Sequence, residues 1–324
     1  MKRLILLLLA GTMAACMPEK EQTTPDNEQQ SVQDSTSLKV ALMPTLDCLP
    51  FYYAKEHDIY QTLGLEVRLL TFNSQMDCDT AFQRGHAELS YTDLVKAAAL
   101  QGGGTGLYVI AQTDGGDELI TSKSKRIKKL TQLKNSMIGI SRNGLCDFLT
   151  DRFSDSLHLG GMDVFKPQVN DIILRTNMLC NDMLDAAFLP EPYATRARMA
   201  GHRSIYGSRQ TGMNLTGLMI TYRAATDSNR AAQTCLLLEG YDRAVEMMNS
   251  APAGDDIRRL LSSVCRLQNE VTDSLHPLQL HFRTLKRPSE EQTDTVVAWL
   301  HRRKLVNKNY TGDTLFLNTF ITRP

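Results

Sequence analysis

Short apolar runs alternate with stretches of helical composition along the first third of this 324-residue chain. Four runs have the length of buried strands: 38–42, 64–70, 87–90 and 107–111. Three stretches between them carry helix-forming residues: 49–60, 77–84 and 93–101. Strands that alternate with helices of this length predict an α/β fold with a mostly parallel sheet covered on both faces.

A second series of strands and helices begins near Asp117. Its predicted strands are 137–141, 171–175 and 185–189, and its predicted helices are 146–157, 178–184 and 193–200. Residues 212–222 are expected to form a strand that leaves this series, and the chain becomes chiefly helical from Ser228 onward. The roughly 285 residues after position 37 are a natural size for two lobes.

The first sixteen residues predict export from the cytoplasm. Lys2 and Arg3 precede the apolar run 4–10, and small residues lead to Cys16. The apolar run is too short for a permanent membrane span, so it reads as a signal peptide. Its end resembles a bacterial lipoprotein box, in which Cys16 is lipidated and becomes the mature N-terminus. The alternative is a plain secretory signal that is cut near Ala15.

Residues 17–37 have the composition of a flexible polar tether. They include no aromatic residue and only one valine, so they cannot bury enough apolar surface to offset the entropy of ordering. The globular body is therefore expected to begin near Leu38, held close to the membrane by the lipid.

The charge balance argues against a polyanionic partner. The chain has 36 Lys and Arg and 36 Asp and Glu residues, so nucleic-acid binding lacks its usual electrostatic basis. No later segment offers eighteen consecutive apolar residues, and we expect no membrane-spanning helix after the signal.

Several short motifs, in order along the chain, resemble a family of solute-binding proteins of ABC importers. The family serves the uptake of sulfonates, taurine, nitrate and the thiamine pyrimidine. The similar segments are 39–41, 50–54, 64–67, 81–88 (AFQRGHAE), 187–194 (AFLPEPYA), 297–300 and 315–317. Each motif alone is weak, but their order and spacing cover nearly the whole body.

This resemblance implies a type II periplasmic-binding-protein fold, in which two α/β lobes enclose a ligand cleft. Lobe 1 would comprise 38–113 and 223–324, and lobe 2 would comprise 114–222. The implied function is capture of a small polar organic solute, sulfonate-like or thiamine-pyrimidine-like, for an ABC permease and ATPase. The protein would be lipid-anchored in the cell envelope of a bacterium, outside the cytoplasmic membrane, with no cofactor and no catalytic residue.

Ligand contacts in this family lie on the loops that follow the strands, where a crevice is expected in open α/β sheets. The resulting candidates are Asp47, Cys48, Tyr53, Asp77, Cys78, Tyr91, Asp93, Asn143, Cys146, Asn177, Cys180 and Glu191. Some have simpler interpretations. Asp93, like Asp79, suits a helix cap, Tyr53 and Tyr91 suit packing, and Glu191 suits a cap that pairs with a nearby Arg.

Four cysteines fall in these loops, each within two positions of an acidic residue. In an oxidising compartment they predict two disulfides inside the lobes, Cys48–Cys78 and Cys146–Cys180. Two alternatives remain: a site for a thiophilic metal or metal-containing ligand, and four buried thiols that pack like small hydrophobic groups. The chain has no C-x-x-C motif, so a metal site would depend wholly on the fold.

Motifs of common enzyme classes are absent from the sequence. The glycine-rich stretch 102–106 lacks the Lys-Ser/Thr of a phosphate-binding loop, and neither H-E-x-x-H nor G-x-S-x-G occurs. An enzyme on the same fold is the less favoured alternative, because the scaffold itself does not forbid catalysis. A sensory or metal-binding lipoprotein that uses the same cleft is a further alternative.

Overall fold

The computed structural model describes residues 36–160, 163–250 and 254–321. The predicted signal peptide, Cys16 and positions 17–35 of the predicted tether lie outside these residues. Ser37 begins the unit that carries both sheets. Within the described residues, no helix is both long enough and apolar enough to cross a membrane.

The first sheet contains five strands in the order β2-β1-β3-β10-β4. Their bounds are β1 Leu38–Leu42, β2 Val67–Thr71, β3 Leu89–Asp93, β4 Leu107–Gln112 and β10 Thr216–Thr221. β1 pairs in parallel with β2 and β3, whereas β10 runs antiparallel to β3 and β4 between which it lies. β1 and β3 are almost wholly buried, which explains their continuous apolar runs.

The helices of this half lie between the strands in sequence. They are α2 Leu49–Glu56, α3 Ile59–Thr62, α4 Gln75–Gln83 and α5 Leu94–Gly102. The predicted helix 49–60 is divided at Asp58, whose φ of 54° is left-handed. Asp93 caps α5 as the simpler interpretation expected. The suggestion that Asp79 caps α4 is wrong, because Ser74 caps this helix and Asp79 lies within it.

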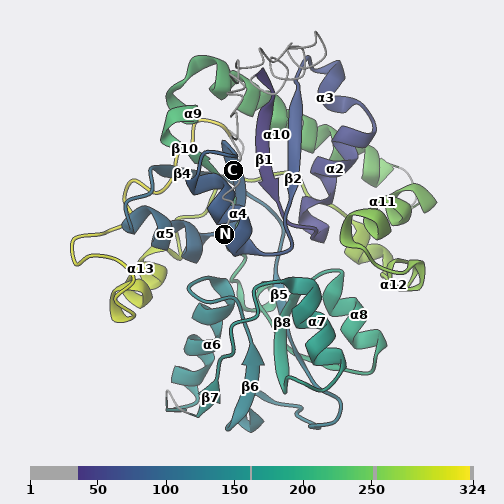
Figure 1. Ribbon diagram of the computed structural model, residues 1–324, viewed down its shortest axis with the longest axis vertical. Coiled ribbons are helices and arrows are strands. Elements are labelled where there is room, and N and C mark those ends of the chain that lie inside the picture. Colours follow the sequence, from purple (N-terminus) through teal and green to yellow (C-terminus); the bar gives the residue numbers. More distant parts are fainter. Residues whose placement is uncertain (1–35, 161–162, 251–253, 322–324) are drawn as a thin grey trace, which may run out of the picture. The chain divides into compact units, whose positions relative to one another are not determined.

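The second sheet also contains five strands, in the order β7-β6-β8-β5-β9. Their bounds are β5 Asp117–Thr121, β6 Ser136–Gly139, β7 Val164–Phe165, β8 Ala186–Pro190 and β9 Arg203–Gly207. The accompanying helices are α6 Leu145–Ser156, α7 Ile172–Cys180 and α8 Tyr193–Met199. α7 and α8 pack against β8, as Figure 1 shows. The prediction of an α/β fold is confirmed.

One pair of predicted elements in this half is wrong. The predicted strand 171–175 and helix 178–184 are replaced by the single helix α7. The Asp171 side chain starts this helix by accepting a hydrogen bond from Leu174 N at 2.9 Å. The apolar run 172–174 has the length of a strand, but here it forms the first turn of a helix.

The remaining helices follow β10. They are α9 Tyr222–Thr226, α10 Ser228–Ser250, α11 Asp255–Cys265, α12 Asn269–Asp273 and α13 Thr293–Arg302. Four short 3-10 turns complete the described structure: Leu46–Cys48, Leu130–Gln132, Arg209–Thr211 and Pro277–Leu280. α10 packs against α2 and α3, and the rings of Tyr241 and Phe51 are 4.5 Å apart. α13 packs against α5, so the end of the chain returns to the first half of the fold.

The chain passes twice between the sheets, from β4 to β5 and from β9 back to β10. A buried hydrogen-bond cluster joins the two crossings. Thr113 Oγ1 donates to Asp47 Oδ2 at 2.7 Å and lies 3.0 Å from Thr216 Oγ1. Both crossings are thereby fixed beside the loop that follows β1.

Candidate functional site

A cavity of about 50 Å³ lies where side chains from both sheets meet. The first half of the fold contributes Gln75, Tyr91, Asp93 and Lys96, and the second contributes Asp117, Ser141, Cys146 and Arg175. Several of these residues stand at strand ends. Asp93 ends β3 and Tyr91 lies within it, Ser141 follows β6, and Asp117 begins the antiparallel β5. The cavity therefore occupies the edge at which α/β sheets generally bind ligands.

Asp93 connects the two halves across this cavity. Its Oδ1 accepts a hydrogen bond from Lys96 N at 2.8 Å, and its Oδ2 accepts one from Leu145 N at 3.1 Å. One carboxylate thus caps α5 in the first half and the first turn of α6 in the second. Burial raises the pKa of Asp93, while these N–H groups oppose that shift.

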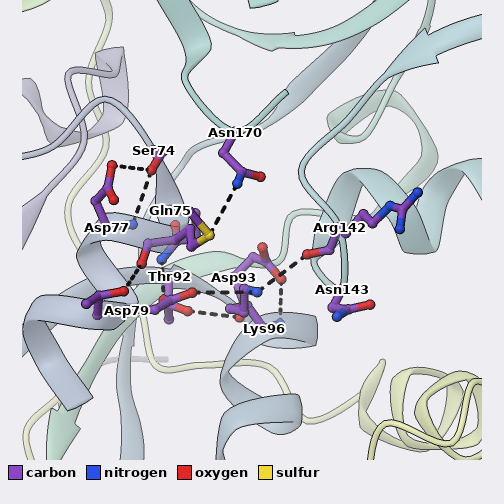
Figure 2. A network of polar contacts seen from close by, with 12 residues as sticks. Ser74, Gln75, Asp77, Asp79, Thr92, Asp93, Lys96, Arg142, Asn143 and Asn170 are labelled. Atoms are coloured by element: carbon purple, nitrogen blue, oxygen red, sulfur yellow. Dashed lines mark hydrogen bonds and ion pairs between the residues drawn. The ribbon is translucent and has the colours of Figure 1, made fainter. Parts of the chain in front are cut away.

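A second polar group lies beside Asp93 on α4 and α5 (Figure 2). Gln75 Nε2 donates to Asp79 Oδ1 at 2.9 Å and to Tyr91 O at 2.7 Å. Lys96 Nζ lies 3.6 Å from Asp79 Oδ2 and donates to Arg142 O at 3.4 Å. Burial raises the pKa of Asp79 to about 6, despite the nearby Lys96 ammonium.

The raised pKa of Asp79 predicts a stability that depends on pH. The folded chain binds the Asp79 proton more tightly than the unfolded chain, so stability from this group is complete below about pH 4 and is lost as pH rises through 6. Asp79→Asn mimics the protonated form, and at about 1.4 kcal/mol per pKa unit it should gain about 3 kcal/mol of unfolding free energy at pH 7. The gain should vanish near pH 4 in urea titrations.

Asp77→Asn is the matched control, since Asp77 is exposed on the same helix and accepts a hydrogen bond from the Ser74 hydroxyl. This control should change the unfolding free energy by no more than about 1 kcal/mol. A loss of stability in Asp79→Asn at pH 7 would contradict the prediction. It would mean that the contact with Lys96 outweighs the cost of burying the charge.

Asp117, Cys146 and Arg175 form the other wall of the cavity. Burial raises the pKa of Asp117 to about 6, against the lowering effects of Arg175 and of a hydrogen bond with the Cys146 thiol. The Arg175 side chain is 3% exposed and donates from Nη1 to Val169 O at 3.0 Å. Its Nε is buried and has no hydrogen-bond partner among the described residues.

A larger cavity of about 200 Å³ adjoins the first on the side of the two chain crossings. Gly116, Asp117 and Pro190 line both cavities. The larger one also has Asp47 and Glu191 in its wall. The two cavities therefore adjoin at the first residue of β5, Asp117, which lines both.

Asp47 and Glu191 are both engaged in hydrogen bonds. Asp47 Oδ1 accepts from Thr45 Oγ1 at 2.7 Å, in addition to the bond from Thr113. Glu191 accepts from Thr195 N at 3.0 Å and forms an ion pair with Arg198. The expected pair of Glu191 with an Arg is confirmed, and although Pro192 holds the N-cap position of α8, the Glu191 carboxylate accepts from an N–H of its first turn.

The structure brings five of the twelve predicted site residues to these cavities: Tyr91, Asp93 and Cys146 at the smaller, and Asp47 and Glu191 at the larger. The other seven line neither: Cys48, Tyr53, Asp77, Cys78, Asn143, Asn177 and Cys180. Tyr53 instead stacks on His57 with ring centroids 3.9 Å apart, and Asn177 Oδ1 accepts from Arg196 at 2.7 Å.

The predicted disulfides Cys48–Cys78 and Cys146–Cys180 are not formed, because all four cysteines are free thiols. Cys48 and Cys78 are wholly buried in the apolar core, and Cys146 lines the smaller cavity. Burial raises the pKa of all three thiols. The alternative of buried thiols that pack like small hydrophobic groups fits Cys48 and Cys78.

Free thiols predict a definite titration result. In a Cys16→Ser chain, denatured without reductant, six cysteines should react with a thiol reagent: Cys48, Cys78, Cys146, Cys180, Cys235 and Cys265. In the native protein, the exposed Cys235 and the partly exposed Cys180 should react first, because the reagent must reach a thiolate. Finding only two reactive thiols after denaturation would restore the two predicted disulfides.

The cleft cysteines do not gather into a metal site. Among the described residues, the one group of three or more candidate ligands is Glu56, His57 and Asp256. His57 Nε2 already lies 3.0 Å from Asp256 Oδ2, and Asp256 also pairs with Arg259. None of these residues lines the two cavities.

Sequence reasoning missed several residues of the smaller cavity, above all Asp117 and Arg175. The sequence could have indicated Asp117, because this residue follows Gly115-Gly116 at the start of the second series of strands and helices. Arg175 was hidden by the wrong assignment of 171–175 to a strand. Lys96 lies on α5, outside the loops that the resemblance emphasised, and Gln75 was within the expected loop 72–79 but not singled out, and it begins α4.

The fold is similar to those of several solved periplasmic binding proteins. The periplasmic aliphatic sulphonate binding protein SsuA from Escherichia coli matches with a TM-score of 0.69 and 13% identity over 87% of this chain and 92% of that one. The alkanesulfonate-binding protein SsuA from Xanthomonas axonopodis pv. citri, bound to MOPS, matches with a TM-score of 0.73 and 13% identity over 87% of this chain and 98% of that one. The periplasmic nitrate-binding protein NrtA from Synechocystis PCC 6803 matches with a TM-score of 0.67 and 14% identity over 85% of this chain and 83% of that one.

No family model matches the sequence. No curated protein matches it either. The structural neighbours nevertheless agree with the resemblance seen in the sequence motifs. The chain has the two-lobe fold of periplasmic solute-binding proteins.

Proposed function

We propose that this protein is the substrate-binding lipoprotein of an ABC importer and captures a small polar organic solute by closure of two lobes. Lobe 1 would comprise 38–113 with 223–324, and lobe 2 would comprise 114–222. The fold supports this proposal, and so does the position of the smaller cavity at the carboxyl ends of strands from both sheets.

The observation that carries the proposal is the contact between the halves at the cavity. Asp93, at the end of β3, accepts a hydrogen bond from Leu145 N at the start of α6. Two crossings of the chain connect the sheets on the side of the larger cavity. A hinge there would let the Asp93 contact open to admit a solute and close over it.

The location and partners follow from the same proposal. Cys16 would carry the lipid, so that the body works outside the cytoplasmic membrane, and the closed form would dock on a permease driven by an ATPase. Transport and sensing use the same closing cleft, and loss of solute uptake on deletion of the gene would favour transport.

The full chain in detergent provides the test. A bound solute should raise the melting temperature by an amount that grows with the logarithm of its concentration above Kd, and a solute retained through purification should appear in the native mass spectrum and leave on unfolding. Incorporation of labelled palmitate that Cys16→Ser abolishes would test the anchor. A chain that stays in the cytoplasm and binds no solute would refute the proposal.

A further inference from the structure

Four charged side chains line the smaller cavity, two of each sign: Asp93, Lys96, Asp117 and Arg175. Charges removed from water are costly unless they are paired or hydrogen-bonded. The partners of these four groups therefore indicate what kind of solute the closed cavity accepts.

Two of the four, Asp93 and Lys96, already have hydrogen-bond or ion-pair partners within the protein. The Asp93 oxygens accept N–H groups at the starts of α5 and α6. Lys96 Nζ lies beside Asp79 and donates to Arg142 O (Figure 2). Helix N-termini are common sites for anions, and here a carboxylate of the protein fills the position at both helices. A bound anion has no place there while the halves are in contact.

Asp117 and Arg175 differ from this first pair. Neither takes part in an ion pair within 4.0 Å among the described residues, although both line the same cavity. The Arg175 side chain is 97% buried, and its Nε has no hydrogen-bond partner among those residues. The cavity is thus lined by a carboxylate whose hydrogen-bond partner is the Cys146 thiol and by a guanidinium, and the two groups do not form an ion pair with each other.

We infer, resting on the proposed solute-binding function, that the solute is a small zwitterion whose ammonium group binds the Asp117 carboxylate and whose anionic group binds the Arg175 guanidinium. A simple anion would satisfy Arg175 but face the unneutralised Asp117. A simple amine would satisfy Asp117 and leave the Arg175 Nε without an acceptor. Only a molecule that carries both an ammonium and an anionic group supplies a partner for Asp117 and for Arg175.

Matched small molecules separate these cases in calorimetry on the full chain. The zwitterions are glycine, β-alanine, 4-aminobutyrate and 2-aminoethanesulfonate, which vary the spacing and the anionic group. Ethanesulfonate and propionate are the anion-only controls, and ethylamine is the amine-only control. At least one zwitterion should bind ten-fold or more tighter than its anion and amine controls, since a hydrogen bond to a buried charge contributes about 1.5–3 kcal/mol.

One variant and a matched control test the contact assigned to Asp117. Asp117→Asn should weaken zwitterion binding about 10- to 100-fold and should reduce the discrimination against the matched anion, because the repulsive charge is gone. Asp185→Asn is the control, since Asp185 is a buried carboxyl of the second half that lines neither cavity. It should leave the affinity unchanged, and circular dichroism checks that both variants fold.

Three outcomes would overturn the inference. If ethanesulfonate, propionate or inorganic nitrate binds as tightly as every zwitterion, the solute class is wrong while solute binding itself stands. If a zwitterion binds but Asp117→Asn has no effect, the assigned contact is wrong. If no probe binds and no solute is retained through purification, both the inference and the proposed function fail.

Discussion

Lys166→Met is expected to lower the free energy of unfolding by about 3 kcal/mol, because it leaves a buried carboxylate without its main cation. Asp147 is fully buried, and its Oδ1 lies 2.5 Å from Lys166 Nζ. Lys166 also lies 2.6 Å from Asp151 Oδ1, so one ammonium serves two carboxylates of α6. Arg303 is 3.5 Å from Asp147 and would compensate only in part.

The matched control is Lys134→Met, which removes an exposed lysine that lies 3.6 Å from Asp163. Exposed pairs contribute about 0–1 kcal/mol, so this variant should remain close to the wild type in urea titrations. Adding Asp147→Asn to Lys166→Met should recover part of the lost stability, because it removes the unpaired charge. Equal losses in the two lysine variants would show that the buried pair has no special role.

Gly217→Ala is expected to cost at least about 3 kcal/mol or to prevent folding, because the added carbon has no room. Gly217 lies in β10, where it pairs with Thr92 of β3 and Gln112 of β4. A Cβ at this position would lie 2.2 Å from the Ala111 carbonyl oxygen and 3.3 Å from its carbon. The obstacle is backbone of a paired strand, which cannot rotate away as a side chain can.

Gly207→Ala, in the edge strand β9, is the control. Its Cβ would meet the Gln210 side chain at 3.4 Å, an ordinary contact distance. This variant should melt within a few degrees of the wild type, whereas Gly217→Ala should melt far lower or accumulate as insoluble chain. A soluble Gly217→Ala protein with an unchanged melting temperature would show that β10 and β4 can separate without cost.

The sequence was sufficient to predict those helices and strands that are determined by residues close together in the chain. The run 38–42 has the apolar length of a buried strand and forms β1, and Asp93 stands where a helix cap is expected and caps α5. The run 172–174 was ambiguous between strand and helix. Only the Asp171 side chain, bonded to Leu174 N, marked it as a helix start.

The site could be predicted only in part, because its decisive contacts join residues far apart in sequence. The Asp93 bond to Leu145 spans 52 positions, and no spacing rule reports it. Asp117 and Arg175 become neighbours of one cavity only after α7 packs against β8. The disulfides were inferred from the expected compartment and from the placement of each cysteine pair in predicted loops of one lobe, and neither determines where a buried thiol points.

The position of β10 has a consequence for the order in which the protein is made. Every strand of the second sheet lies between Asp117 and Gly207, whereas the first sheet lacks its strand between β3 and β4 until Thr221 has been synthesised. On a ribosome that adds about 5–20 residues per second, the sheet encoded in the middle of the chain can close while the one begun earlier is still incomplete. The half that is synthesised first therefore completes its sheet last, and until then the unpaired edges of β3 and β4 need protection from other chains.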